Sequence, residues 1–252
     1  MYKIVLLGAG NLASQLGRSL QEVGHEILQV YSRSHDSASL LAQTMGVPFT
    51  ISLAELRDDA DIYLFALSDA ALPEVLLQMP KLDGLFVHTA GSLALDVFAG
   101  YTSRYGVFYP LQTFSKQRKV SFEMLPIFIE ANNPEDEMLL ADLARSISSK
   151  VQSLDSVQRS YLHLAAVFAC NFSNHLYALA AKILEGQGLD WKLLLPLIQE
   201  TASKVEEMSP PEAQTGPALR EDSIVMNKHL KMLRDPNVAH IYDLLSQSII
   251  II

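Results

Sequence analysis

The first residues that could do chemistry form a short glycine-rich run, Gly8-Ala9-Gly10-Asn11-Leu12-Ala13. It follows the apolar stretch Lys3–Leu7 and precedes leucines at helical spacing, so it stands between a predicted strand and a predicted helix. In such a pattern the first glycine permits a tight turn, the second lets backbone amides approach a pyrophosphate, and the alanine keeps helix and strand close. The run predicts a dinucleotide site, and a doubly wound fold that has lost its ligand is the alternative. The predicted phosphate-binding residues are Gly8, Gly10, Asn11 and Leu12.

The end of the next apolar run indicates which dinucleotide is bound. NAD-binding folds place a carboxylate there for the ribose 2′-hydroxyl, but this chain reads Tyr31-Ser32-Arg33-Ser34 and Asp36 comes too late. A guanidinium between two hydroxyls suits a 2′-phosphate, because arginine makes charge-assisted bidentate contacts with phosphate oxygens. We therefore expect NADP, with Ser32, Arg33 and Ser34 at the phosphate. The alternative for Arg33 is an ordinary surface arginine.

Two polar residues of a long apolar helix are the candidates for catalysis. Hydride transfer to a carbonyl needs a proton donor beside the nicotinamide, whereas an iminium acceptor needs it less. His163 and Asn171 are eight residues apart, about 80° around a helix, and can share one face. His163 is expected to act as an acid and Asn171 to orient the substrate or the carboxamide of the nicotinamide. A hydrogen-bonded core histidine is the alternative for His163.

Near the carboxy terminus, Thr215-Gly216-Pro217 is predicted to open a helix running to Leu233. A helix amino terminus attracts anions, and Arg220 one turn further would strengthen a site for a substrate carboxylate. A structural network of Arg220 and Asp222 is the alternative. The predicted substrate-binding residues are Gln112, Thr215, Gly216 and Arg220.

These residues need a framework, and the first 155 residues alternate short β-rich runs with helical patterns. Such runs belong to a parallel sheet covered on both faces, which predicts a doubly wound α/β fold. The predicted strands are Lys3–Leu7, Ile27–Tyr31, Pro48–Thr50, Ile62–Leu67, Leu85–Thr89, Gly106–Tyr109, Ile127–Glu130 and Lys150–Leu154. Open sheets of this kind bind ligands at the carboxyl ends of their strands. We therefore add to the predicted cofactor site Ala66, Leu67, Ser68, Thr89, Ala90 and Gly91.

The remainder of the chain shows helical periodicity only. This shift predicts a Rossmann domain over residues 1–155 and an all-α domain over residues 156–252. Further helices are predicted at Val157–Glu185, Trp191–Glu207 after an Asp190 cap, and about Val238–Ser248. The stretch Tyr161–Leu184 is apolar nearly all round, with polar interruptions that argue against a lipid-facing span, so we expect a buried helix. Together with the tail Ile249–Ile252, it predicts a homodimer formed through the helical domain.

Composition narrows the class of protein. Hydrophobic residues make up 49% of the 252 residues, charged residues 19%, and the net charge is −9, which argues against extended disorder and nucleic-acid binding. The short basic run 116–119 is expected to be a solvated loop. One cysteine, Cys170, indicates a reducing compartment, so a cytoplasmic location is expected, without a signal peptide. No metal-ligand spacing, hydrolase elbow or P-loop lysine motif occurs.

Several motifs together resemble pyrroline-5-carboxylate reductase-like NADP oxidoreductases. Besides the glycine-rich turn and the Ser-Arg-Ser run, they are Asp61–Asp69, His88–Ser92, Tyr109–Phe114, His163–Phe172 and Thr215–Asp222. The resemblance covers essentially the whole chain and implies a Rossmann domain followed by a helical domain of uncharacterised function, like that of 6-phosphogluconate dehydrogenase. Related hydroxyacid dehydrogenases carry a lysine early in the helical domain, but no lysine occurs between Val151 and Ala181.

The function expected from all of this is reduction of a small C=N or C=O substrate, one bearing a carboxylate, by NADPH. Two alternatives stay open. One is a non-catalytic NADP-binding regulatory protein, in which His163 and Asn171 need not face the nicotinamide. The other is a reductase whose hydride partner is a deazaflavin.

Overall fold

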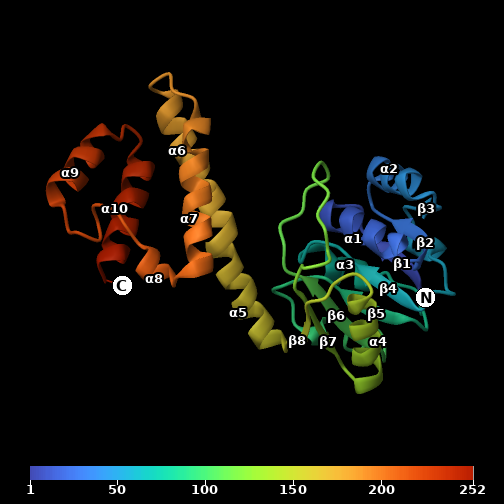
Figure 1. Ribbon diagram of the computed structural model, residues 1–252. Coiled ribbons are helices and arrows are strands. Elements are labelled where there is room, and N and C mark those ends of the chain that lie inside the picture. The colour runs from blue at the N-terminus through green and yellow to red at the C-terminus, as the bar shows by residue number, and fades with distance from the viewer. Residues whose placement is uncertain (252) are drawn as a thin grey trace. The chain divides into compact units, whose positions relative to one another are not determined.

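The computed structural model describes residues 1–251, and the first of its two compact units, Met1–Cys170, is built on one eight-stranded sheet (Figure 1). The order of the strands is β3-β2-β1-β4-β5-β6-β7-β8. The strands are β1 (Lys3–Leu7), β2 (Glu26–Tyr31), β3 (Phe49–Thr50), β4 (Ile62–Phe65), β5 (Leu85–His88), β6 (Tyr105–Pro110), β7 (Ile127–Ala131) and β8 (Val151–Ser153). Each predicted strand is present, with ends that lie within two residues of the prediction.

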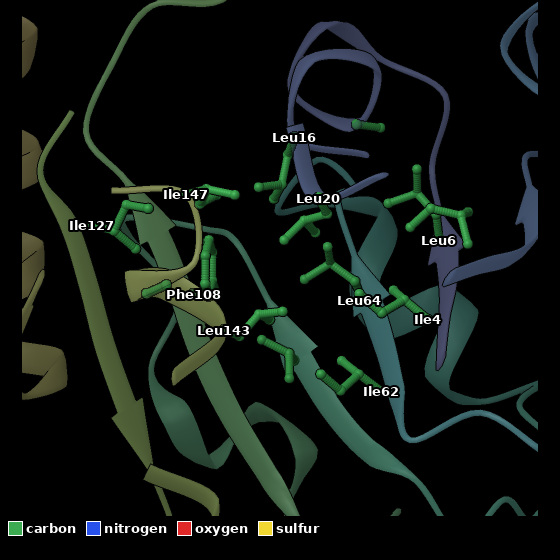
Figure 2. Packing of buried hydrophobic residues seen from close by; sticks show 14 of the residues in the cluster. Ile4, Leu6, Leu16, Leu20, Ile62, Leu64, Phe108, Ile127, Leu143 and Ile147 are labelled. Carbon is green, nitrogen blue, oxygen red and sulfur yellow. The ribbon is translucent and has the colours of Figure 1, made fainter. Parts of the chain in front are cut away.

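Helices cover both faces of the sheet because successive side chains of a strand point to opposite sides. Ile4 and Leu6 of β1 join one buried cluster, and Val5 and Leu7 join another. The first cluster is filled by α1 (Asn11–Glu22), α2 (His35–Met45) and α4 (Pro134–Arg145), and the second by α3 (Ala71–Leu76) with the 3₁₀ segments η1 (Leu53–Glu55) and η2 (Leu95–Phe98). Figure 2 shows the first cluster, which contains Leu16 and Leu20 of α1 together with Leu64 of β4 and Phe108 of β6. The doubly wound fold class is therefore confirmed.

One pairing differs from the parallel sheet that the sequence predicts. Strands β1 to β6 pair in parallel, β7 runs antiparallel to β6, and β8 is parallel to β7. A parallel crossover needs a connection that traverses the sheet, usually a helix. Residues 111–126 between β6 and β7 contain no helix, so the chain returns in the opposite direction.

The remaining elements are helical. They are α5 (Ser156–Ala166), the π-helical segment η3 (Val167–Phe172), α6 (Ser173–Glu185), the 3₁₀ segment η4 (Trp191–Leu194), α7 (Leu195–Glu207), α8 (Pro210–Ala213), α9 (Ser223–Met232) and α10 (Pro236–Ile251). The second compact unit is Asn171–Ile252, whereas α5 belongs to the first. The domain boundary after residue 155 stays a prediction. Asp190 caps η4 as expected, because its side chain accepts a hydrogen bond from the backbone amide of Lys192 at 2.9 Å. Ile252 of the isoleucine tail lies outside the described residues.

The prediction of a helix that begins at Pro217 is wrong. Residues 217–221 form a turn, and both Gly216 before it, with φ 116°, and Glu221 at its end, with φ 51°, lie outside the right-handed helical region. The helix α9 begins six residues later, where the Asp222 carboxylate accepts a hydrogen bond from the Val225 amide at 3.1 Å. This cap is stronger than the one expected at Thr215, and it removes the argument for an anion site at a helix amino terminus there.

The expectation that the long apolar helix is buried is also wrong for the single chain. By length and composition alone, one helix of the described chain, Ser156–Glu185, could span a membrane, and no part of its most apolar window is buried. One such helix is weak evidence for a membrane, since the core helix of a soluble protein meets the same criterion. None of its apolar side chains is fully buried among residues 1–251.

Candidate functional site

The glycine-rich turn has the geometry that a pyrophosphate requires. Gly8 has φ 123°, and a Cβ on it would lie 2.2 Å from the carbonyl oxygen of Ala66, so no other residue fits. The turn is fixed further by the Gly8 amide, which donates to the carbonyl of Tyr31 at 2.7 Å. By contrast, a Cβ on Gly10 would meet no protein atom within 4 Å, and no side chain caps α1 at that position. The first glycine thus serves the fold, and the second leaves open space at the amino terminus of α1 for an anion.

Asn11 connects this turn to the chain that follows β6. Its side-chain amide donates to the carbonyl of Phe114 at 2.9 Å, and Gln15 donates to the carbonyls of Ser115 and Arg118. The segment after β6 is thereby held along α1. Gln112 lies in this segment, is exposed, and accepts a hydrogen bond from its neighbouring amide. Asn11 therefore has a structural contact that the phosphate prediction did not include, while Leu12 is half-buried against the core.

The residues predicted to select NADP lie at the end of β2. Ser34 caps α2 by accepting a hydrogen bond from the amide of Ser37, and Ser32 accepts one from the amide of Ser34 at 3.3 Å. Both hydroxyl protons stay available to donate to a phosphate. Arg33 is exposed, and its guanidinium lies 3.6 Å from the carboxylate of Glu74. An exposed pair of this kind is weak, so a 2′-phosphate could replace the carboxylate.

Two further turns lie at the same edge of the sheet. Ser68 follows β4 and accepts hydrogen bonds from the first amides of α3, and the Ser92 hydroxyl after β5 donates to the carboxylate of Asp69. Between them, the Thr89 amide donates to the carbonyl of Phe65 at 3.3 Å. The structure thus brings together the predicted turns Ala66–Ser68 and Thr89–Gly91, in which Ala66, Leu67 and Ser68 are at least partly exposed and Thr89, Ala90 and Gly91 are buried.

His88 shapes the second of these turns from inside the protein. It is 1% exposed, and its Nδ1 atom accepts a hydrogen bond from the Ala90 amide at 3.2 Å. Burial, reinforced by the positive charge of Arg159, lowers the pKa of His88 to about 3. The imidazole is therefore neutral at physiological pH and supports the turn as an acceptor.

His163 of α5 packs against the same turn. A Cβ on Gly91 would lie 2.6 Å from both Cγ and Nδ1 of His163, so only glycine permits this approach. The Nδ1 atom also lies 2.9 Å from the hydroxyl of Tyr109, at the end of β6. His163 is half-buried rather than enclosed. The structure thus places His163 against the turn after β5, and its role in catalysis stays a prediction.

The first turn of α5 is anchored by a buried cation. Arg159 is 1% exposed, forms an ion pair with Glu130 of β7, and donates to the carbonyl of Leu93 at 2.5 Å. Ser156 adds to this anchor, since its hydroxyl donates to Glu130 and accepts from the Leu95 amide at 2.9 Å. Because Arg159 precedes His163 by one helical turn, the anchor fixes where the imidazole lies.

Sequence reasoning missed the residues that support His163. Tyr109, His88, Glu130 and Arg159 lie in or beside apolar runs, and a single sequence offers no signal that pairs them. A buried arginine next to a strand-borne glutamate is visible only after the strands are aligned. Two sequence predictions were wrong, the helix that begins at Pro217 and the burial of the long apolar helix. Both features depend on tertiary contacts.

For the predicted site residues of the second unit, the structure describes only their surroundings within that unit. Asn171 is exposed and lies in η3, a π-helical segment of the kind often found at functional sites. Thr215, Gly216 and Arg220 lie in the turn before α9, with Thr215 and Arg220 exposed. Their approach to the cofactor turns stays a prediction. Over residues 1–251, no group of three or more histidine, cysteine or carboxylate side chains could hold a metal ion.

Two known families match successive parts of this chain. Residues 3–88 match the family described as NADP oxidoreductase, coenzyme F420-dependent, and residues 125–249 match a domain of unknown function, DUF2520. A "putative NADP oxidoreductase" from Bacteroides fragilis is 48% identical over 99% of this chain and 98% of its own, with a TM-score of 0.93. The chain belongs to this family of NADP oxidoreductases. NADP is the cofactor of the family, as the Ser-Arg-Ser run predicts.

More distant structures share the fold. A reductive aminase from Aspergillus terreus, in complex with NADPH and ethyl-5-oxohexanoate, is 13% identical over 98% of this chain and 93% of its own, with a TM-score of 0.75. A 1-pyrroline-5-carboxylate reductase from Streptococcus pyogenes is 15% identical over 100% and 99%, with a TM-score of 0.65. No curated protein matches the chain. The expected resemblance to pyrroline-5-carboxylate reductase is thus confirmed at the level of the fold.

Proposed function

We propose that this protein reduces a small C=N or C=O compound bearing a carboxylate, with NADPH as the hydride donor. The observation that carries the proposal is His163, which lies against the buried turn after β5 with Nδ1 engaged by Tyr109. A nicotinamide bound by a Rossmann fold lies near the carboxyl ends of the strands, where this turn is found. The fold shared with a reductive aminase and a pyrroline-carboxylate reductase supports a C=N acceptor.

The residues present fit NADP. Gly10 leaves room for the pyrophosphate, and Arg33 with the hydroxyls of Ser32 and Ser34 would hold the 2′-phosphate. When bound, the cofactor supplies a hydride to the acceptor carbon. The chain's own part is to exclude water at the buried Thr89–Gly91 turn and to offer a proton from His163 to the acceptor heteroatom. Asn171 and Arg220 would orient the acceptor and its carboxylate.

Turnover assays with purified protein test this proposal. The acceptors are a cyclic imine with and without a carboxylate, a 2-oxo acid and a deazaflavin, and the readout is NADPH oxidation. We expect the carboxylated cyclic imine to be reduced fastest, and His163→Gln to lose about two orders of magnitude in kcat while NADPH binding is kept. NADPH binding without oxidation by any acceptor would instead support a regulatory protein, and exclusive use of the deazaflavin would replace the substrate class.

We also propose that the protein is a homodimer formed through its helical unit. Within the described part of that unit, only Ala218 is buried, while large apolar side chains such as Ile183, Leu193, Leu197 and Ile224 are exposed. Apolar exposure on this scale is costly in water, and closed two-fold pairing is the commonest way to cover it. A second copy of the chain is therefore the occupant that we propose for this surface.

A further inference from the structure

We propose that Tyr109 is a positioning residue that fixes which nitrogen of His163 donates a hydrogen bond to the acceptor heteroatom of the substrate. Its hydroxyl binds Nδ1 and leaves the proton of the neutral imidazole on Nε2. This inference rests on the proposed reductase function, in which the N–H of His163 faces the acceptor heteroatom. The inference gives a role to Tyr109, which the sequence alone does not indicate.

The contact between the two rings is well defined. The Tyr109 hydroxyl and Nδ1 are 2.9 Å apart, and the ring centroids are 5.9 Å apart with the planes at 75°. Tyr109 is 8% exposed, and burial raises the pKa of its phenol more than the charge of Arg159 lowers it. The phenol therefore keeps its proton at neutral pH and can donate it to Nδ1.

The imidazole is held from a second side. Cγ and Nδ1 of His163 face the backbone of Gly91, at a distance that leaves no space for a side chain. The Tyr109 hydroxyl is hydrogen-bonded to the Nδ1 atom of this ring. A half-turn of the ring about the Cβ–Cγ bond would put Cδ2 in the place of Nδ1 and lose that hydrogen bond. The Nδ1 edge is thus committed to the protein, and Nε2 is left for a ligand.

The first turn of α5 holds the His163 ring in place beside the Tyr109 ring. Arg159, one turn before His163, is bound by Glu130 and by the carbonyl of Leu93, which follows the Gly91 turn by two residues. The helix and the turn are therefore tied to each other as well as to the sheet. Such support limits the motion of His163 and keeps its Nδ1 atom at the Tyr109 hydroxyl.

The tautomer can be read directly by NMR of protein labelled with ¹⁵N-histidine, without cofactor or substrate. His163→Gln assigns the signals. We expect the wild-type His163 to carry its proton on Nε2, with Nδ1 shifted as a hydrogen-bond acceptor, and Tyr109→Phe to move the Nδ1 signal and mix the tautomers. The matched control is Tyr105→Phe in the same strand, which should leave the signals unchanged. A proton on Nδ1 in the wild type, or an unchanged spectrum in Tyr109→Phe, would overturn the inference.

Kinetics separates this inference from the proposed function. With an acceptor that turns over, Tyr109→Phe should lower kcat about tenfold, the loss expected for one hydrogen bond that holds the donor, and leave the KM for NADPH unchanged. Equal kcat in wild type and Tyr109→Phe would contradict the positioning role. A fixed Nε2–H tautomer in a protein that reduces no acceptor would contradict the proposed function instead.

Discussion

We expect Gly8 to be needed for stability and Gly10 for cofactor binding, and single substitutions can separate these two roles. Gly10→Ala adds a methyl group where no protein atom lies within 4 Å, so stability should be kept while NADPH affinity falls. Gly8→Ala places a Cβ 2.2 Å from the Ala66 carbonyl at φ 123°, so it should lower the free energy of unfolding by about 2 kcal/mol or more. Urea unfolding and fluorescence titration with NADPH measure both effects. A stable Gly10→Ala with unchanged affinity would show that the pyrophosphate lies elsewhere.

We expect Arg33 to decide between the two nicotinamide cofactors. Arg33→Ala removes a charge-assisted phosphate contact, so NADPH affinity should fall roughly ten- to hundredfold while NADH affinity stays the same. Glu74→Gln is the matched variant, because it removes the carboxylate that lies 3.6 Å from Arg33 and should leave NADPH affinity equal or higher. Fluorescence titrations with both cofactors give the answer. Wild-type protein that binds NADH as tightly as NADPH would refute the assignment to Arg33.

At the scale of elements, His88 couples the turn after β5 to pH. Its native pKa of about 3 lies below the value of about 6.5 in an unfolded chain, so the unfolded state binds more protons between these pH values. Its contribution to stability is complete above pH 6.5 and is lost as the pH falls toward 3. His88→Gln should therefore reduce the dependence of the free energy of unfolding on pH by up to about 1.4 kcal/mol per pH unit between pH 6 and 4.

Urea unfolding at several pH values measures that slope. His35→Gln, the same exchange at an exposed position of α2, is the control for the change of residue type. An unchanged slope in His88→Gln would show that the buried imidazole is not excluded from protonation. The result would then remove the neutral acceptor on which the geometry of the Gly91 turn depends.

The observed strands and helices also show which parts of the fold could be predicted from the sequence. Local patterns predict all eight strands and the turn at Gly8, because apolar runs and glycines determine these features within a few residues. The antiparallel β7 and the turn at Pro217 depend on what the chain meets after it leaves an element, and no local pattern encodes that. Likewise, His163 could be named from its residue type, but its partners Tyr109 of β6 and Gly91 of the turn after β5 could be found only in the structure.

At the scale of the whole molecule, the exposed helical unit predicts association. Ile183→Glu in α6 and Leu197→Glu in α7 place charges on apolar positions that are 47% and 63% exposed in the single chain. Each should shift the dimer to monomer at micromolar concentration, as measured by light scattering, because a buried unpaired charge is costly. Gln187→Glu, at an exposed polar position after α6, is the control. A wild-type protein that is strictly monomeric would refute the dimer.

The end of α10 provides a second test of the proposed dimer surface. Ile251 is 83% exposed, and Ile250 is 43% exposed in the single chain. If these side chains are covered in a dimer, deletion of residues 249–252 should weaken association without loss of the sheet core. Deletion with no change in association or stability would show that the tail takes no part in the interface.

The central claim, reduction of a small acceptor by NADPH, is tested most directly by following the hydrogen itself. The protein is incubated with NADPH deuterated at C4 of the nicotinamide and with a carboxylated cyclic imine, and the product is analysed by mass spectrometry. The account predicts one deuterium on the former imine carbon, and a strong reduction of this transfer in His163→Gln. A product without deuterium, or no product at all from wild-type protein that binds NADPH, would contradict it.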